Sequence, residues 1–172
     1  AGALHFLAAN SHVENVYRQH ALAMRRSPIE TSWLNRVQVA RTLKEYELAD
    51  GIHVASEYSR QSFLNAGVPA EKLRRIHCTT PERFTRPENR VRDGVARIVE
   101  SGSLTVAKGT PLLLEAFARL GGIKAELTLV GGWGTRGMRK YLQARVAVDP
   151  RIKIVPGDPL PHLQRADVYV HP

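Results

Sequence analysis

The sequence predicts an α/β fold in which helices cover parallel sheets. From residue 95 onward, short apolar strands alternate strictly with helical segments. Such alternation is typical of a parallel sheet, because each strand needs a crossover helix to return beside its neighbour. Turns of small residues follow two of these strands, at 101–103 and 131–132. Turns of this composition let a strand pass directly into the next helix.

The first 78 residues predict elements of the same kind. Residues 3–9 are small and apolar, which predicts a buried strand, and 12–24 have a weak helical period. Ser27 and Glu30 have the spacing of a capping box, with Pro28 at the first helical position, so we expect a long helix from there to Asp50. The other expected elements are a strand at 52–55, a helix that Ser56 caps and Gly67 ends, and a strand at 74–77.

Residues 79–94 separate two predicted domains. This stretch is polar, contains two prolines and has little periodicity, as a linker does. We therefore expect one domain over 1–78 and a second over 95–172. The second should contain strands at 95–100, 125–130, 151–155 and 167–171 and helices at 111–120, 135–147 and 160–165. The last strand lacks its following helix, so we expect a piece of a larger protein, incomplete at both ends.

The charge balance points to an anionic partner. The chain has 25 Lys and Arg against 16 Asp and Glu, a formal net charge of +9. The basic residues form short clusters, such as Arg25-Arg26 and Arg74-Arg75, that suit a phosphate-bearing ligand, an anionic membrane or nucleic acid. A solvated basic surface without a partner is the alternative. Aromatic residues are few and lie apart from the clusters, so no nucleic-acid partner is expected.

Cysteine and hydropathy patterns restrict the class further. Cys78 is the only cysteine, which excludes an internal disulfide and a cysteine-rich metal site, and the histidines show no metal-ligand spacing. No apolar run approaches the roughly 20 residues that span a bilayer. The first ten residues lack the basic region of a secretory signal. We therefore expect a cytoplasmic protein without a metal ion.

The segment around Lys108 has the pattern of a phosphate-binding loop. An apolar strand leads into the turn at 101–103, and Lys108-Gly109 then precedes a helix with Thr110 as the expected N-cap and Pro111 as its first residue. Such a strand, loop and helix offer backbone N–H groups and one cation to a phosphate. The alternative is a common loop ending before a helix.

A glycine-rich stretch offers a rival interpretation. Gly132, Gly134 and Gly137 match the dinucleotide pattern G-x-G-x-x-G between a strand and a helix. Asp158 follows the next strand, where a dinucleotide fold has its ribose-binding acid. This predicts an NAD(P)-binding oxidoreductase. The fingerprint normally lies on the first strand of its domain, however, and here a complete strand–loop–helix unit precedes it. We favour a nucleotide-facing loop, and a turn without ligand is the remaining alternative.

His12 is the one candidate catalytic residue of the first domain. It follows the buried strand and the turn at Asn10-Ser11, and ligands of open α/β sheets bind at that edge. A histidine there can orient an acceptor or share its proton. On spacing alone, a loop histidine that caps the following helix is the favoured alternative.

Six segments together resemble glycosyltransferase family 4. Residues 45–73 (E-Y-E-L-A-D-G-I-H-V-A-S through A-G-V-P-A-E-K-L) resemble the end of that family's N-terminal domain, and E-R-F-T-R-P (82–87) resembles its linker. Its donor-binding domain is resembled, in successive parts, by S-G-S-L-T-V-A-K-G-T-P-L-L-L-E-A-F-A-R-L (101–120), A-E-L-T-L-V-G-G (125–132), R-I-K-I-V-P-G (151–157) and R-A-D-V-Y-V-H-P (165–172). These are retaining enzymes with two Rossmann-like domains, the GT-B fold.

The resemblance implies transfer of a sugar from a nucleotide-diphospho-sugar to an acceptor hydroxyl. Residues 1–78 would then belong to the acceptor-side domain and 95–172 to the donor domain. His12 matches, weakly, a histidine near the reacting sugar. The resemblance implies no cofactor besides the donor substrate, and no metal, because lysine, arginine and helix N-termini can hold the leaving diphosphate. The donor-binding residues it implies are Gly102, Ser103, Lys108, Gly109, Gly131, Gly132, Val155 and Gly157.

Departures from the family pattern carry expectations of their own. Ser103 stands where many members have arginine, and Cys78-Thr79-Thr80 replaces the usual G-V-D. The acidic E-x7-E region would begin only after Pro172, so we expect these 172 residues alone to be inactive. The basic clusters before residue 42 suit a lipid-linked acceptor, or a glycan, at the inner face of an anionic membrane, where the protein would bind peripherally.

Overall fold

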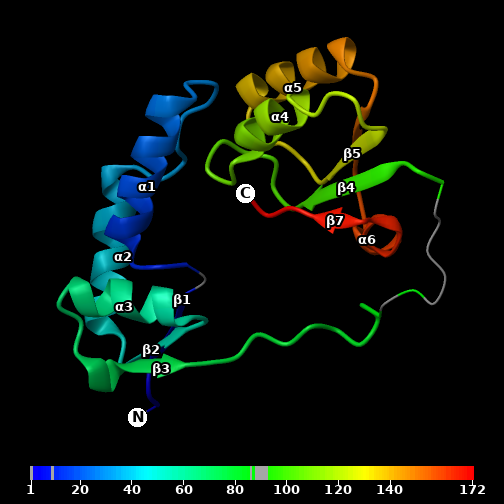
Figure 1. The fold of residues 1–172 in the computed structure, drawn as a ribbon. Coiled ribbons are helices and arrows are strands. Elements are labelled where there is room, and N and C mark those ends of the chain that lie inside the picture. Colours follow the sequence, from blue (N-terminus) through cyan, green and yellow to red (C-terminus); the bar gives the residue numbers. More distant parts are fainter. Residues whose placement is uncertain (1, 9, 86, 88–92) are drawn as a thin grey trace. The chain divides into compact units, whose positions relative to one another are not determined.

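The chain consists of two compact α/β units (Figure 1). The computed structural model describes residues 2–8, 10–85, 87 and 93–172. Unit 1 comprises Ala1–Leu22 and Ser32–Thr80, and unit 2 comprises Ala23–Thr31 and Pro81–Pro172. Residues 86 and 88–92 of the predicted linker lie outside the described residues. Each unit contains a parallel sheet, which confirms the predicted fold class.

Unit 1 has a three-stranded sheet in the order β1-β2-β3. The strands are β1 (His5–Ala8), β2 (Gly51–Val54) and β3 (Leu73–Arg75). The helical segments are α1 (Val13–Arg26), α2 (Arg36–Leu48), α3 (Glu57–Asn65) and the short 3-10 helix η1 (Ala70–Lys72). The last four residues of α1 are counted with unit 2.

One face of the unit 1 sheet carries its core. Ile52 and Val54 on β2 are completely buried and pack with Phe63 of α3. The alternate positions face the other way, as the two-residue period of a strand requires. There Leu7 is 65 % exposed, and the rings of His5 and His53 meet with 3.0 Å between Nδ1 and Nε2. The sequence had predicted all three strands of this unit.

The helix predicted from residue 27 to 50 is wrong in its first third. Helix α2 begins at Arg36, and its capping box is formed by Asn35 and Gln38. The Gln38 backbone N–H donates to the Asn35 side chain at 3.0 Å, and the Gln38 side chain accepts from the Asn35 N–H at 2.9 Å. The carboxylate of Glu30 instead accepts hydrogen bonds from residues far along the chain. Ser27 and Glu30 therefore start no helix.

Unit 2 has a four-stranded parallel sheet in the order β6-β5-β4-β7. The strands are β4 (Ala96–Ser101), β5 (Ala125–Val130), β6 (Ile152–Val155) and β7 (Val168–Tyr169). The helices are α4 (Thr110–Ala118), α5 (Arg136–Val148) and α6 (Leu160–Arg165). The predicted strands and helices of this unit are all present, with bounds that shift by one or two residues.

Both faces of the unit 2 sheet carry buried apolar residues. Leu127 and Leu129 of β5 pack with Phe117 of α4 and Leu142 of α5 in the larger cluster. On the other face, a smaller cluster joins Val99, Val130 and Ala166, with Leu163 of α6 packed against it. Apolar residues on both faces of a strand are typical of parallel sheets that helices cover on both sides.

The start of α4 differs from the prediction at one residue. Its N-cap is Gly109, at a φ of 77°, and Thr110 is already the first helical residue. A side chain at this φ is strained, and a Cβ on Gly109 would also lie 2.9 Å from the Cβ of Pro172. Thr110 is completely buried, and its hydroxyl donates to the Glu100 carboxylate at 2.8 Å. Gly109 is therefore at the N-cap because a side chain there would be strained and crowded by Pro172. Thr110 instead forms a hydrogen bond to Glu100 on β4.

Candidate functional site at the carboxyl edge of the unit 2 sheet

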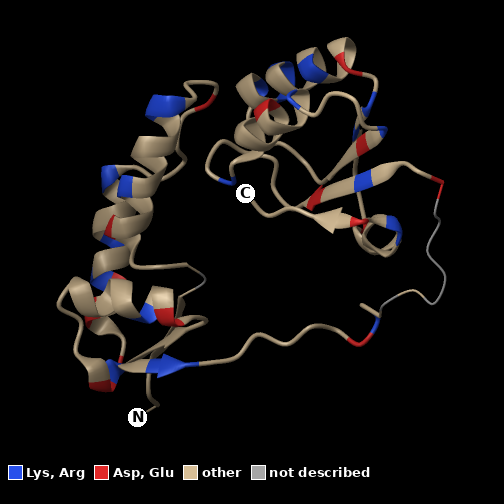
Figure 2. Cartoon of the chain, in the orientation of Figure 1, with Lys and Arg blue, Asp and Glu red and all other residues tan. Residues whose placement is uncertain are grey.

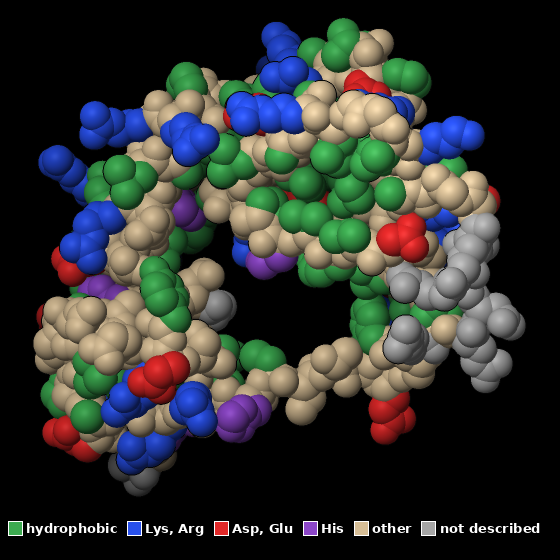
Figure 3. Space-filling view, in the orientation of Figure 1, with side chains coloured by type: hydrophobic (Ala, Val, Ile, Leu, Met, Phe, Trp, Pro, Cys, Tyr) green, Lys and Arg blue, Asp and Glu red, His purple; other side chains and the backbone are tan. Residues whose placement is uncertain are grey.

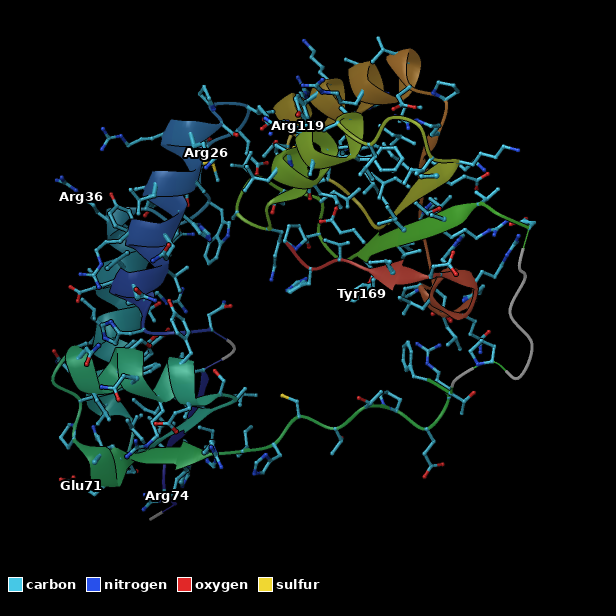
Figure 4. The ribbon with its side chains drawn as sticks, in the orientation of Figure 1. Arg26, Arg36, Glu71, Arg74, Arg119 and Tyr169 are labelled. Atoms are coloured by element: carbon cyan, nitrogen blue, oxygen red, sulfur yellow. The ribbon has the colours of Figure 1, made fainter. Side chains whose placement is uncertain are left out.

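All four strands of unit 2 are parallel, so their carboxyl ends meet at one edge of the sheet. The chain moves from β4 outward through β5 to β6, and then returns to the other side of β4 to form β7. The strand order thus reverses between β4 and β7. Open α/β sheets bind ligands in the crevice at such a reversal. Figure 4 labels Tyr169 on β7, and its hydroxyl lies 3.4 Å from Ser101 Oγ on β4.

Glycines let the loops after β4 and β5 approach each other at this edge. The N–H of Gly102 donates to Val130 O at 2.9 Å, and the N–H of Gly131 donates to Val155 O at 2.9 Å. Gly102 and Gly131 have φ values of 135° and 149°, and a Cβ on Gly131 would overlap the carbonyl oxygen of Gly102. Gly102, Gly131 and Val155, three of the predicted donor-binding residues, are therefore neighbours.

The loop from Gly102 to Gly109 has buried apolar side chains on one side and exposed residues on the other. Leu104 and Val106 are buried in the larger core cluster, whereas Ser103 and Lys108 are exposed. The backbone N–H groups of Ser103, Thr105 and Ala107 donate to no residue in the described part of the chain. Within the same residues, the Lys108 ammonium forms no ion pair.

Unpaired N–H groups beside a free ammonium are what an anionic phosphate needs, since it accepts hydrogen bonds and is attracted by the charge. The geometry of this loop thus agrees with the sequence-based hypothesis for Lys108. The diphosphate contact itself stays a prediction. The same holds for Gly132, whose carbonyl accepts from Leu104 N at 2.9 Å, and for Gly157, which has a φ of 101° beyond β6.

The dinucleotide interpretation finds little support in the geometry. Gly137 does not pack against a strand, because a Cβ there would overlap the carbonyl oxygen of Ile29. Asp158, the proposed ribose-binding acid, accepts from the Leu160 N–H at 3.1 Å and pairs with Arg83 at 2.7 Å. The bond from the Leu160 N–H, and then the charge of Arg83, lower the pKa of this carboxyl. Asp158 therefore stabilises the turn before α6 and pairs with Arg83.

A buried carboxyl group lies on the strand that leads into the loop. Glu100 on β4 is 3 % exposed, and one carboxyl oxygen accepts the Thr110 hydroxyl. The other has no hydrogen-bond partner in the described residues. Burial raises the pKa of Glu100, because the charged form loses its hydration. Sequence analysis missed this group, although a single glutamate at the end of an apolar strand was a visible signal.

His12 has a structural role in unit 1. Its ring is 3 % exposed and packs against the rings of Tyr46 and Phe63. Nδ1 accepts the N–H of Glu14 at 3.4 Å, so the ring caps the first turn of α1, as the alternative interpretation expected. Burial lowers the pKa of His12, which favours the neutral ring that this bond requires. A catalytic role stays a prediction, and the burial of the ring does not support it.

Unit 1 contains a cavity of about 390 Å³ beside β1. Phe6, Leu34 and Tyr46 form apolar walls, and Arg41 and Glu45 add charged groups. Trp33, which is 65 % exposed, lies at the same cavity. A mixed lining of this kind suits a small ligand with both apolar and polar groups.

Basic residues are spread over the helices of both units. Figure 2 shows Lys and Arg on several helices, and the space-filling view does not show them gathered into one patch (Figure 3). Arg26 at the end of α1 and Arg36 at the start of α2 are both exposed (Figure 4). No helix in the described part of the chain is long and apolar enough to cross a membrane. Among the same residues, no three His, Cys, Asp or Glu side chains are grouped as metal ligands.

Comparison with solved structures identifies the fold. Anabaena HepE in complex with UDP and glucose superposes with a TM-score of 0.72 at 15 % identity, over 98 % of this chain and 46 % of that one. TarM matches with a TM-score of 0.64 at 12 % identity, over 98 % and 31 %. The lipopolysaccharide outer core galactosyltransferase WaaB, in its apo form, matches with a TM-score of 0.53 at 16 % identity, over 96 % and 48 %.

These matches show that the chain has the GT-B fold of glycosyltransferases, built from Rossmann-like parallel sheets, as the resemblance implied. The chain spans about half the length of HepE. No protein-family profile matches the sequence, and no curated protein matches it either.

Proposed function

We propose that these residues belong to a retaining glycosyltransferase of family 4 that uses a nucleotide-diphospho-sugar. Unit 2 would bind the donor, and unit 1 would contribute to the acceptor side. The proposal rests above all on the edge where the Gly102 and Gly131 loops meet beside the exposed Lys108. HepE, with which the chain shares its fold, was crystallised with UDP and with UDP-glucose. We therefore propose a uridine donor.

The chemistry of the site follows from charge. In the transfer, the bond between the anomeric carbon and the diphosphate breaks, and the acceptor oxygen forms a bond to that carbon with retention of configuration. Negative charge develops on the leaving diphosphate. The Lys108 ammonium can stabilise that charge without a metal ion, together with the N–H groups of Ser103 and Ala107, which have no partner among the described residues. With Ser103 in place of an arginine, the site has one cation fewer than many family members.

Unit 1 would receive the acceptor. Its cavity of about 390 Å³ has apolar walls and charged groups, as a lipid-linked or glycan acceptor would need. The exposed Arg26 and Arg36 would favour peripheral contact with an anionic membrane at the cytoplasmic face. Because the chain spans about half of HepE, we propose this activity for the enzyme to which these residues contribute. From the 172 residues alone we expect nucleotide binding without turnover, and measurable turnover would contradict that expectation.

Fluorescence of Trp133 tests the donor assignment. This residue lies in the loop between Gly132 and Gly134, and Trp33→Phe removes the only other tryptophan. We expect UDP to change the emission saturably and UDP-glucose to compete with it. Saturable binding of NADH without any effect of UDP would replace the proposal with the oxidoreductase alternative. Binding of anions that depends steeply on salt, without competition by UDP, would indicate a basic surface only.

A further inference from the structure

The segment of residues 27–31 is counted with unit 2 although it precedes that unit's sheet by more than sixty residues. Its Glu30 carboxylate accepts two hydrogen bonds. One comes from the Val106 N–H at 2.6 Å, and the other comes from the Thr135 hydroxyl at 3.0 Å. Neither donor is close in sequence, since they lie 76 and 105 residues further on. A single side chain thus joins three separate parts of the chain.

The two donors belong to the two loops of the candidate nucleotide site. Val106 lies two residues before Lys108, in the loop that follows β4. Thr135 ends the loop that follows β5, and it caps α5 by accepting the Met138 N–H at 3.2 Å. Glu30 therefore bridges the loop with the exposed lysine and the loop with the glycines.

The backbone and an apolar side chain seat the same segment. A Cβ on Gly137 would overlap the carbonyl oxygen of Ile29, so only a glycine in the first turn of α5 leaves room for the segment. The Ile29 side chain, together with Ala23 and Met24, packs against the larger core cluster of unit 2. The residues before Glu30 are thus held in place by packing against unit 2.

We infer that Glu30 is a positioning residue for nucleotide binding, which holds the β4–α4 and β5–α5 loops at the spacing that the ligand requires. The inference rests on the proposed function. A carboxylate makes stronger hydrogen bonds than a neutral acceptor, and it is favoured near the positive N-terminus of α5. Loops held in the binding geometry before the ligand arrives lose less entropy on binding, which raises affinity.

The alternative is that Glu30 blocks the site as an internal substitute for phosphate. The hydrogen bonds argue against this role. Glu30 uses the N–H of Val106, whereas the N–H groups of Ser103, Thr105 and Ala107 stay unpaired in the described residues. The side chain of Val106 is buried in the core of unit 2, so this residue anchors the loop to the core. The donors left open to a ligand are therefore different from the one that Glu30 occupies.

The test compares variants of the 172-residue chain in two measurements, UDP affinity by Trp133 fluorescence and amide exchange of the two loops without nucleotide. Glu30→Ala removes the bridge, and Gly137→Ala displaces the segment without touching Glu30. Glu115→Gln, an exposed glutamate on α4, is the matched control. We expect both bridge variants to weaken UDP binding about tenfold, the equivalent of one hydrogen bond to a charged group. They should also speed amide exchange over 102–109 and 131–137, while Glu115→Gln changes neither.

Substitutions at Thr135 distinguish positioning from general stability. Thr135→Ser keeps the hydroxyl and should bind UDP like the wild type, whereas Thr135→Val should behave like Glu30→Ala. The double variant, Glu30→Ala with Thr135→Val, should lose less UDP affinity than the sum of the two single losses, because both changes break the bond between Glu30 and Thr135. Each change also removes one bond of its own, from the Val106 N–H to Glu30 and from the Met138 N–H to Thr135. UDP affinity that is unchanged or higher in Glu30→Ala and Gly137→Ala would overturn the inference. A wild type that fails to bind UDP would contradict the proposed function, and unchanged exchange in the loops would then overturn the bridge as well.

Discussion

The carboxyl edges of the two sheets differ in how the backbone groups are used. In unit 1 the chain's own side chains close the edge. Ser59 Oγ donates to the carbonyl oxygen of Asn10 at 2.8 Å, and the N–H of His12 donates to Ser62 Oγ at 2.8 Å. In unit 2 the residues at the edge are mainly glycines, and loop N–H groups next to Lys108 find no partner in the described residues.

A parallel sheet followed by helices is not enough to form a ligand-binding edge. Both units have parallel strands followed by helices, so both expose an edge of the kind that binds ligands. The residue types after the strands decide the outcome. Serine and histidine side chains satisfy backbone groups at the edge of unit 1, whereas Gly102 and Gly131 have no side chain with which to do so. Phosphate binding is therefore expected in unit 2.

The largest effect should come from filling the contact between the two glycine loops. We expect Gly131→Ala to cost about 2–5 kcal/mol of stability, because the new Cβ meets the Gly102 carbonyl at a φ that strains alanine. UDP binding should be lost with it. Chemical denaturation, followed by Trp133 emission, measures the change.

Gly132→Ala is the matched control, because no atom of the described residues lies within 4 Å of a Cβ there and its φ is not positive. We expect it to cost less than about 1 kcal/mol. If Gly131→Ala and Gly132→Ala lowered stability equally, the contact between Gly131 and Gly102 would not be what stabilises the two loops.

A smaller effect should follow from removal of the Lys108 ammonium in the β4–α4 loop. We expect Lys108→Met to weaken UDP binding by about 1.5–3 kcal/mol, as the loss of a charged hydrogen bond does, with little change in stability. Isothermal titration calorimetry measures the affinity. Lys140→Met, an exposed lysine on α5, controls for net charge. If Lys108→Met and Lys140→Met weakened UDP binding equally, the effect would be general electrostatic attraction and not a specific contact with Lys108.

The smallest effects should appear as opposite pH dependences in the two units. In unit 2, burial raises the pKa of Glu100 above its ordinary 4.5, so its protonated form favours the folded state. Its contribution to stability is complete below pH 4.5 and is lost as the pH rises through the raised value. Denaturation at a series of pH values should show this slope, and Glu100→Gln should flatten it.

In unit 1, burial lowers the pKa of His12 below its ordinary 6.5, so protonation favours unfolding. The contribution of the neutral ring is complete above pH 6.5 and is lost as the pH falls through the lowered value. His12→Gln should reduce the loss of unfolding free energy as the pH falls. It should leave unchanged the loss with rising pH that Glu100 causes. If Glu100→Gln and His12→Gln changed the pH dependence of stability in the same direction, these two buried groups would not be its cause.

The helices and strands of the unit 2 sheet, and most of those of unit 1, can be predicted from local sequence patterns. Strands such as Ala125–Val130 and helices such as α6 follow from local period and from turn residues, which act on their neighbours within a few positions. The same local logic located Lys108 and the glycine loops. It could not show that Gly131 lies against Gly102, because that contact depends on the register of two strands.

Some residues have two alternative sets of hydrogen-bond partners, and their role depends on contacts with distant parts of the chain. Glu30 has the spacing of a capping box, yet its carboxylate accepts from Val106 and Thr135. Thr110 has the place of an N-cap, yet it is buried against Glu100. In both cases a local hydrogen bond of modest strength loses to a non-local one that burial strengthens. Such a choice depends on distant parts of the chain, so no pattern within a few residues reveals it.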